Sequence, residues 1–340
     1  MKKIGLILLL FSFLSICVGK KKITPDIISE KVKYDSDDPA IWVNKIKPSK
    51  SIVFGTDKDS DGAIYAFDLE GNIIPEKSIY NLKKPNNIDI AYNVKISDDL
   101  KTDILVVTER ERKKIRIFAI PSMAPLDNGG LPVFENEHEG YRQPMGIALY
   151  TSSIDNSVYI IVSRKKGPAS GYLFQYKLVQ DEGALSLKLV RKFGEFSKEQ
   201  EIEAVAVDNE LGFIYYSDEN YGIRKYFAEP DMGNEELYCF GKNIFEHDIE
   251  GIAIVKYKGG KGYLVVSNQQ NQSFSVFSRK ENKFIKEIYL ETKDTDGCDA
   301  VSVPLNDTFN TGIFVAMNNS RNFYFYNLEK LGLPSNIKDQ

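Results

Sequence analysis

Three acidic residues lie directly before an apolar, strand-like run near the start of the chain, in the stretch YDSDDPAIWVN over residues 34–44. They are Asp35, Asp37 and Asp38, and Pro39 restricts the backbone beside them. Carboxylates that crowd together raise one another's pKa, so their ionisation is opposed unless a cation offsets the charge. The stretch therefore predicts a cation site at the beginning of a β-strand.

Acids recur in the same way along the chain. Six short β-rich runs begin about 50 residues apart: PAIWV (39–43), IDIAY (88–92), MGIAL (145–149), EAVAV (203–207), EGIAI (250–254) and DAVSV (299–303). Carboxylates stand at or just ahead of the start of four of them: Asp37, Asp38, Glu203, Asp248, Glu250, Asp296 and Asp299. If the six runs are equivalent strands around one axis, we expect these carboxylates to meet at one end of it.

Calcium is the cation that such a set favours, because it accepts about six to eight oxygen ligands in a flexible shell. Softer ligands are scarce, and with His138 and His247 as the only histidines a three-histidine zinc site is excluded. The alternative interpretation is that each acid caps backbone N–H groups or belongs to a solvated rim.

Basic residues begin the loops after several second apolar runs. They are Lys58 after GTD, Arg110 after VVTE, and Arg164, Lys165 and Lys166 after IIVS. A site that combines cations with Lys and Arg suits a polyanionic, oxygen-rich substrate, and phosphate esters are the obvious class. Taken singly, such residues are also typical of a solvated loop.

The elements that must position these residues repeat in a fixed order. Each first run is followed by a second, such as SIVFGTD, and by a third, such as GAIYAFD, with turn-forming linkers between them. This pattern predicts an all-β protein, a six-bladed β-propeller whose first strands line a central channel. Two β-sandwiches would also give short strands, but they do not account for six repeats in one order.

The first 19 residues have the pattern of an export signal. Two lysines precede an apolar run from Ile4 to about Val18, which is shorter than the roughly 20 residues of a spanning helix. LSIC resembles a bacterial lipoprotein cleavage box at Cys17, whereas cleavage near CVG would release a free protein. We expect an exported bacterial protein that is periplasmic, secreted or an outer-membrane lipoprotein.

The remaining chain is predicted to form one propeller domain over residues 24–334. No other segment approaches membrane length, so no transmembrane helix is expected after the signal. The net charge of −4 argues against nucleic acid as a partner. Cys239 and Cys298 are the cysteines beyond the signal, and the sequence leaves open whether they pair. We expect a monomer.

Several long motifs resemble the β-propeller phytases, which are also called alkaline phytases. They are DDPAIWV, NNIDIAY, the GTDK loop, IEAVAVDNELGFIYYSDE, DIEGIAI followed by GKGYLVVSNQQNQSFSVF, and DTDGCDAVSVPLNDTFNTGIFVA. The resemblance covers roughly residues 24–334 in order. It implies a calcium-dependent phosphohydrolase of the 3-phytase type that acts on myo-inositol hexakisphosphate (phytate) and binds several calcium ions at the channel mouth.

The resemblance also implies site residues, position by position. The implied calcium ligands are Asp37, Asp38, Glu203, Glu219, Asp248, Glu250, Gln269 and Asp296. The implied catalytic residues among them are Asp37, Glu203, Glu219 and Glu250. The implied phosphate-binding residues are Lys58, Arg110 and Lys165. The expected reaction is hydrolysis of a phosphomonoester by metal-activated water, since the chain offers no motif for a His or Cys nucleophile.

Four features depart from the family pattern. Asp59 stands where a second lysine is usual, Lys166 where an acid is common, and Met145 where an aromatic residue contacts phosphate. The loop before Asp294 is also shorter and lacks an aspartate. Two alternatives therefore remain open: a non-catalytic calcium-binding propeller, and a calcium propeller that cleaves another ester, such as a lactone or a different phosphate ester.

Overall fold

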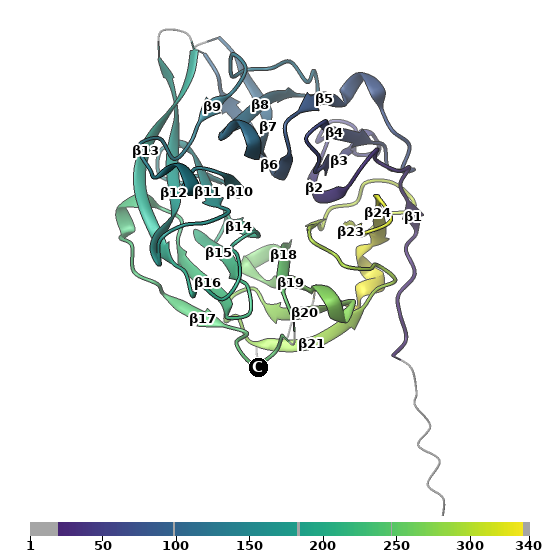
Figure 1. The fold of residues 1–340 in the computed structure, drawn as a ribbon. Coiled ribbons are helices and arrows are strands. Elements are labelled where there is room, and N and C mark those ends of the chain that lie inside the picture. The colour runs from purple at the N-terminus through teal and green to yellow at the C-terminus, as the bar shows by residue number, and fades with distance from the viewer. Residues whose placement is uncertain (1–19, 98, 182–183, 246, 336–340) are drawn as a thin grey trace, which may run out of the picture.

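Six four-stranded antiparallel sheets surround a central channel in the computed structural model, which describes residues 20–335 except 98, 182–183 and 246 (Figure 1). The predicted six-bladed propeller is confirmed, and the two-sandwich alternative is wrong. The predicted export signal over residues 1–19 lies outside the described residues. Within the described part, no helix is long and apolar enough to span a membrane.

The first five blades follow the chain, each built from four consecutive strands. Blade 1 consists of β2 (Ser36–Trp42), β3 (Ile52–Asp57), β4 (Gly62–Phe67) and β5 (Ile79–Leu82). Blade 2 consists of β6 (Pro85–Lys95), β7 (Lys101–Glu109), β8 (Lys114–Ile120) and β9 (Leu131–Pro132). Blade 3 consists of β10 (Pro144–Thr151), β11 (Val158–Arg164), β12 (Ser170–Asp181) and β13 (Ala184–Glu195). Blade 4 consists of β14 (Val205–Asp208), β15 (Phe213–Asp218), β16 (Gly222–Phe227) and β17 (Tyr238–Phe240). Blade 5 consists of β18 (Ile249–Lys256), β19 (Gly262–Asn268), β20 (Ser273–Ser278) and β21 (Phe284–Tyr289).

Blade 6 joins the two ends of the described chain. It consists of β22 (Cys298–Val301), β23 (Ile313–Asn318), β24 (Asn322–Asn327) and β1 (Ile27–Ile28). The pairing places Ile27 opposite Phe325, and Figure 1 shows the purple N-terminal strand beside the yellow C-terminal one. This strand from the N-terminal segment closes the ring.

Short 3-10 helices occupy several of the connections. They are η1 (Pro48–Lys50), η2 (Pro75–Lys77), η3 (Arg110–Arg112), η4 (Glu139–Tyr141), η5 (Pro230–Met232), η6 (Lys258–Gly260), η7 (Gln269–Asn271) and η8 (Leu328–Leu331).

The hydrophobic core is divided among the six interfaces between neighbouring blades. Each interface of the described structure contains one cluster of buried apolar side chains, as between Val106 of blade 2 and Ile147 of blade 3. The second strands are covered on both faces, which suits their β-branched and aromatic residues. Cys239 and Cys298 are both free thiols, so the two do not pair.

Candidate active site

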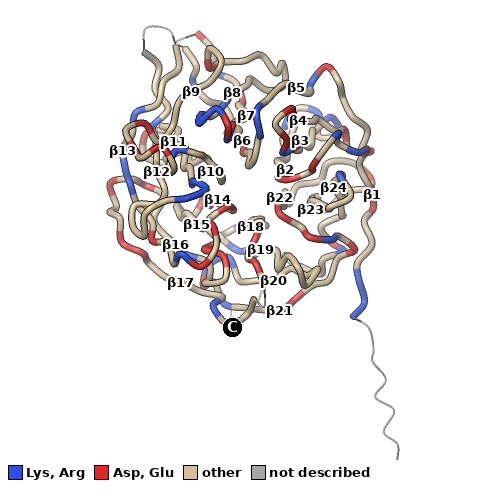
Figure 2. Tube along the Cα trace, viewed as in Figure 1, with Lys and Arg blue, Asp and Glu red and all other residues tan. Residues whose placement is uncertain are grey.

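One position from each blade forms a ring at one mouth of the channel. Strand pairing makes six residues equivalent, each lying opposite the third-last residue of its second strand: Pro39, Ile88, Ile147, Val205, Ile252 and Cys298. Two positions earlier stand the residues that we call the mouth ring: Asp37, Asn86, Met145, Glu203, Glu250 and Asp296. Figure 2 shows acidic segments near the inner ends of β2, β14 and β22, with basic segments near β6, β7 and β10.

β-Bulges lie at this mouth. The pairing register shifts where four ring residues lie, between Ser36 and Pro39 and at the matching places of blades 2, 3 and 5. A bulge interrupts the alternation of side chains along a strand and re-aims them. As a result, Asp37 contacts Lys58, while the Oδ2 atom of Asp38 accepts a hydrogen bond from the backbone N–H of Ile88 in blade 2 at 3.1 Å.

Asp38 fits beside blade 6 because Gly297 has no side chain. A Cβ atom on Gly297 would lie 2.3 Å from the Oδ1 atom of Asp38. The carboxylate of Asp38 is thus wedged between blades 6 and 2. Burial raises its pKa, and the hydrogen bond from Ile88 opposes that shift only in part.

The ammonium group of Lys58 lies among three carboxylates of the mouth ring. It forms an ion pair with Asp37, and its Nζ atom is 3.7 Å from both Glu203 Oε1 and Asp296 Oδ2. Burial alone would lower the pKa of Lys58, but the three carboxylates raise it. Lys58 is therefore charged, and it supplies positive charge inside the ring.

Asn86 connects a second base to the same ring. Its side-chain amide donates a hydrogen bond to Glu203 Oε1 at 2.6 Å, and its carbonyl oxygen accepts one from Arg110. Burial raises the pKa of Glu203, but the charges of Lys58 and Arg110 outweigh burial and hold that pKa below its ordinary value. Asn86 was not among the residues predicted for the site.

A cluster of three glutamates lies beside the ring in blade 4. One carboxylate oxygen each from Glu201, Glu203 and Glu219 lies within 4.8 Å of the others, an arrangement that could hold a metal ion. Lys165 forms an ion pair with Glu201. Burial, followed by the charges of Glu203 and Glu201, raises the pKa of Glu219 to about 8. Glu201 was not predicted to belong to the site.

Blades 5 and 6 supply the remaining predicted ligands. Glu250 is buried, and its pKa is raised by burial and by the charges of Glu203 and other nearby acids. Asp296, in the loop before β22, accepts a hydrogen bond from the side-chain amide of Gln269. Asp248 is placed further out, where it accepts a hydrogen bond from Gln270 at 2.6 Å.

The carboxylate oxygens at the mouth are suitable ligands for a cation. Both carboxylate oxygens of Asp37 and the Oε2 atom of Glu250 are buried without a hydrogen-bond partner, although Lys58 forms an ion pair with Asp37. Buried acceptors of this kind need a partner, and a hard divalent cation binds carboxylate oxygens. Residues from blades 1, 4, 5 and 6 could therefore hold one or more metal ions.

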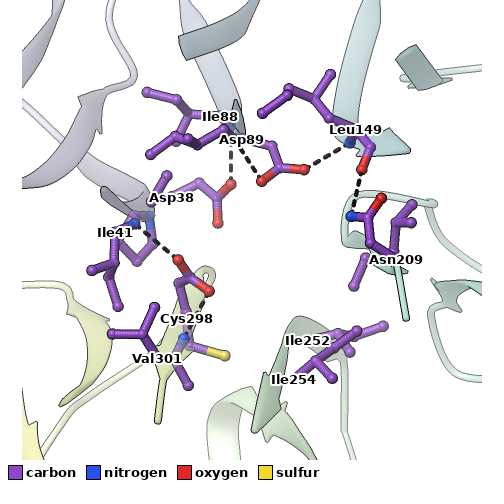
Figure 3. Close-up of a pocket in the computed structure, with 18 of the residues that line it drawn as sticks. Asp38, Ile41, Ile88, Asp89, Leu149, Asn209, Ile252, Ile254, Cys298 and Val301 are labelled. Carbon is purple, nitrogen blue, oxygen red and sulfur yellow. Dashed lines mark hydrogen bonds between the residues drawn. The ribbon is translucent and has the colours of Figure 1, made fainter. Parts of the chain in front are cut away.

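Asp299 was expected at the mouth, and that expectation is wrong. The residue lies one step deeper than the strand position of Cys298, and its carboxylate accepts hydrogen bonds from the backbone N–H groups of Ile41 and Ala300. Asp299 lines a cavity of about 710 Å³ inside the channel, whose walls are mostly apolar residues of the first strands, such as Ile41, Ile88 and Ile252 (Figure 3). Asp299 thus ties blade 6 to blade 1.

The basic residues of blade 3 serve different purposes. Arg164, which the sequence grouped with Lys165, is wholly buried and donates to the carbonyl oxygens of Tyr172 and Gly171 at 2.8 and 2.9 Å. Its role is to hold the blade together. Lys166 is exposed, so Lys165 is the basic residue of this group that contacts an acid of the site.

The raised pKa values predict how the metal-free protein responds to pH. Asp37 (pKa about 6, raised by burial) and Glu219 (about 8) both hold protons more tightly in the folded than in the unfolded chain. Their contribution to stability is present at low pH and is lost as pH rises through about 6 and then about 8. In chelator, the melting temperature should therefore fall as the pH rises toward 8, and in Glu219→Gln it should fall less steeply between pH 6 and 8. An unchanged slope in that variant would contradict the assignment.

The fold and site define a class of protein: a six-bladed propeller whose mouth combines clustered carboxylates with Lys and Arg. The family model described as Phytase matches residues 16–324, and the chain belongs to this phytase family. The chain is also similar to the 3-phytase of Bacillus subtilis (strain 168), with 30% identity over 298 residues that cover 83% of this chain and 74% of that protein. It is accordingly a phytate-hydrolysing phosphatase, which disfavours the non-catalytic alternative.

Proposed function

We propose that phytate hydrolysis by this protein depends on calcium held at the mouth ring. The proposed ligands are Asp37, Asp38, Glu203, Glu219, Asp248, Glu250, Gln269 and Asp296, to which the structure adds Glu201 as a candidate. The observation that carries the proposal is the ring itself, in which four of six equivalent positions are carboxylates and the buried Oε2 atom of Glu250 has no hydrogen-bond partner. Calcium bound there would offset the charge of the phosphate oxygens and favour ionisation of the attacking water.

The protein's own residues then bind and orient the substrate. Lys58, Arg110 and Lys165 would donate charged hydrogen bonds to phosphate oxygens and stabilise charge that develops there. Of the four proposed catalytic carboxylates, Glu203 has the lowered pKa, so it is ionised near neutral pH and available to bind a cation. Together with Asp37, Glu219 and Glu250, it would hold the cation and orient the attacking water.

Export and a monomeric state are part of the same proposal. The charged and apolar pattern of residues 1–19 supports export, with either lipidation at Cys17 or release of a free protein. The mass of the mature protein, determined after expression in a bacterium, distinguishes these two outcomes. Analytical ultracentrifugation tests the monomer.

Phosphate release from phytate with and without calcium tests the proposed function. We expect release with calcium and almost none after chelation, with full recovery when calcium is restored. Release that is unchanged by chelation would contradict the calcium dependence. Slow release from phytate together with rapid hydrolysis of a lactone or of another phosphate ester would instead support the altered-specificity alternative.

Asp37 and Asp35 provide a matched comparison of a proposed ligand with an exposed neighbour. Asp37→Asn keeps the shape but removes the charge, so calcium should bind at least about tenfold more weakly, and high calcium should partly restore activity. Asp35→Asn should leave calcium affinity and activity close to those of the wild type. Calcium titrations of activity, on variants whose folding is checked by circular dichroism, give the answer. Equal damage from the two substitutions would show that the ligand assignment is wrong.

A further inference from the structure

The acidic mouth already contains a cation of its own. Lys58 follows β3 directly, and its Nζ atom lies against Asp37 and 3.7 Å from carboxylate oxygens of Glu203 and Asp296. Its side chain is 17% exposed, and the side chain of Asp37 only 1%. The three carboxylates come from blades 1, 4 and 6, so one ammonium group bridges acids from across the channel.

A divalent cation and this ammonium group would compete for the same carboxylates. Asp37 and Glu203 are both proposed calcium ligands, and calcium requires ligand oxygens at about 2.3–2.6 Å. A cation bound to Asp37, Glu203 and Asp296 would repel Lys58 and compete for the same lone pairs. Binding of the ion therefore favours displacement of the ammonium group, and the ammonium group weakens binding of the ion.

We propose that Lys58 is an internal counter-ion that offsets part of the negative charge of the mouth ring in the absence of metal, is displaced when calcium binds, and is then free to contact substrate phosphate. This inference rests on the proposed function and deepens it. It gives one residue two successive partners, the carboxylates first and a phosphate group afterwards. Without such a counter-ion, the acids of the empty site would repel one another and destabilise the fold.

Calcium affinity in phosphate-free buffer tests the competition. Removing the competitor in Lys58→Met should tighten calcium binding by about tenfold, a typical size for coupling between two binding events. Lys58→Arg retains the charge and should stay close to the wild type. The matched control is Lys33→Met, since Lys33 pairs with Asp61 at 3.1 Å on the same blade and is exposed. Isothermal titration calorimetry measures the calcium affinity of the wild type and of the three variants after treatment with chelator.

The direction of the change in calcium affinity in Lys58→Met distinguishes between the possible roles of Lys58. A lysine that only binds phosphate would leave calcium affinity unchanged, and one that only positions the carboxylates would weaken calcium binding when removed. Either result would overturn the inference. If the wild type binds calcium and only Lys58→Met fails to behave as expected, the proposed function survives. If the wild type binds no calcium, the proposed function fails as well.

Lysine labelling of the wild type provides a second measurement that does not depend on a variant folding without metal. An acetylating reagent should modify Lys58 slowly in chelator, where the ammonium group is held by three carboxylates, and several-fold faster in calcium. Lys33 should be labelled equally in both. Mass spectrometry of peptides reports both sites. Labelling of Lys58 that does not change with calcium would overturn the displacement.

Discussion

Glu203→Gln is expected to lower the rate of phosphate release from phytate by at least about a hundredfold. Loss of a group that only supports a metal ligand lowers metal affinity or activity by about 10- to 100-fold. Glu203 should matter more, because it belongs to both the mouth ring and the glutamate cluster and also contacts Lys58. The substitution keeps the shape of the side chain and removes its charge. Initial rates at saturating calcium measure the effect.

The matched control for this variant is Glu235→Gln, also in blade 4. Glu235 is exposed and lies in the connection between β16 and β17, away from the mouth ring. Its activity should equal that of the wild type. Near-native turnover by a folded Glu203→Gln protein would rule out the proposed role of this carboxylate.

Chelation of calcium should lower the melting temperature by about 5 °C. A ligand that binds only the native state at about a hundredfold excess over its Kd contributes about 2.7 kcal/mol to the free energy of unfolding, and large domains shift by a few degrees per kcal/mol. The physical reason is the crowding of buried carboxylates such as Asp37, Glu219 and Glu250. Thermal scans with EDTA and with calcium measure the difference.

Magnesium is the informative comparison for the chelation experiment. It demands near-octahedral geometry and keeps its water ligands, so it should restore little of the lost stability. Equal recovery with magnesium would indicate general screening of the acids and not a calcium site. A melting curve that EDTA leaves unchanged would indicate that the acids of the mouth ring are solvated rim residues and not calcium ligands.

The blade number could be predicted from the sequence because every repeat keeps three apolar runs in the same order. Such runs fit strands that are covered on both faces, as β3 and β19 are. The pairing of β1 with β24 was not predicted, because two residues give too short a pattern. The closure depends on long-range contact between chain ends, which no local periodicity shows.

The acids of the site could be predicted from their spacing, but the register could not. Asp37 and Asn86 each lie two residues before an equivalent strand position, Pro39 and Ile88 respectively, and this spacing is visible in the sequence. A search for acids passes over the asparagine. Asp299 was misplaced because it begins a β-rich run, as Glu203 and Glu250 do, yet its run starts deeper in the channel.

Two other outcomes required tertiary information. Glu201 lies in an irregular loop, so no strand position identifies it, and only the folded chain brings it near Glu219. Arg164 follows the same motif as its basic neighbours in the sequence. Its guanidinium group nevertheless packs 4.5 and 4.6 Å from the ring centres of Phe134 and Phe174, a contact that draws it into the blade interior.

The closure of the ring by β1 has a consequence for the order of events during synthesis. Asp37 and Asp296 meet around Lys58, yet one is translated early and the other almost last. A nascent chain therefore carries the first of these acids long before it carries the second. The complete ring of carboxylates can form only after Asp296 has been made, because contacts between distant parts of a chain are slow to form. A chain truncated before this residue has acids but no assembled mouth ring, so the proposed metal site would be completed only late in synthesis.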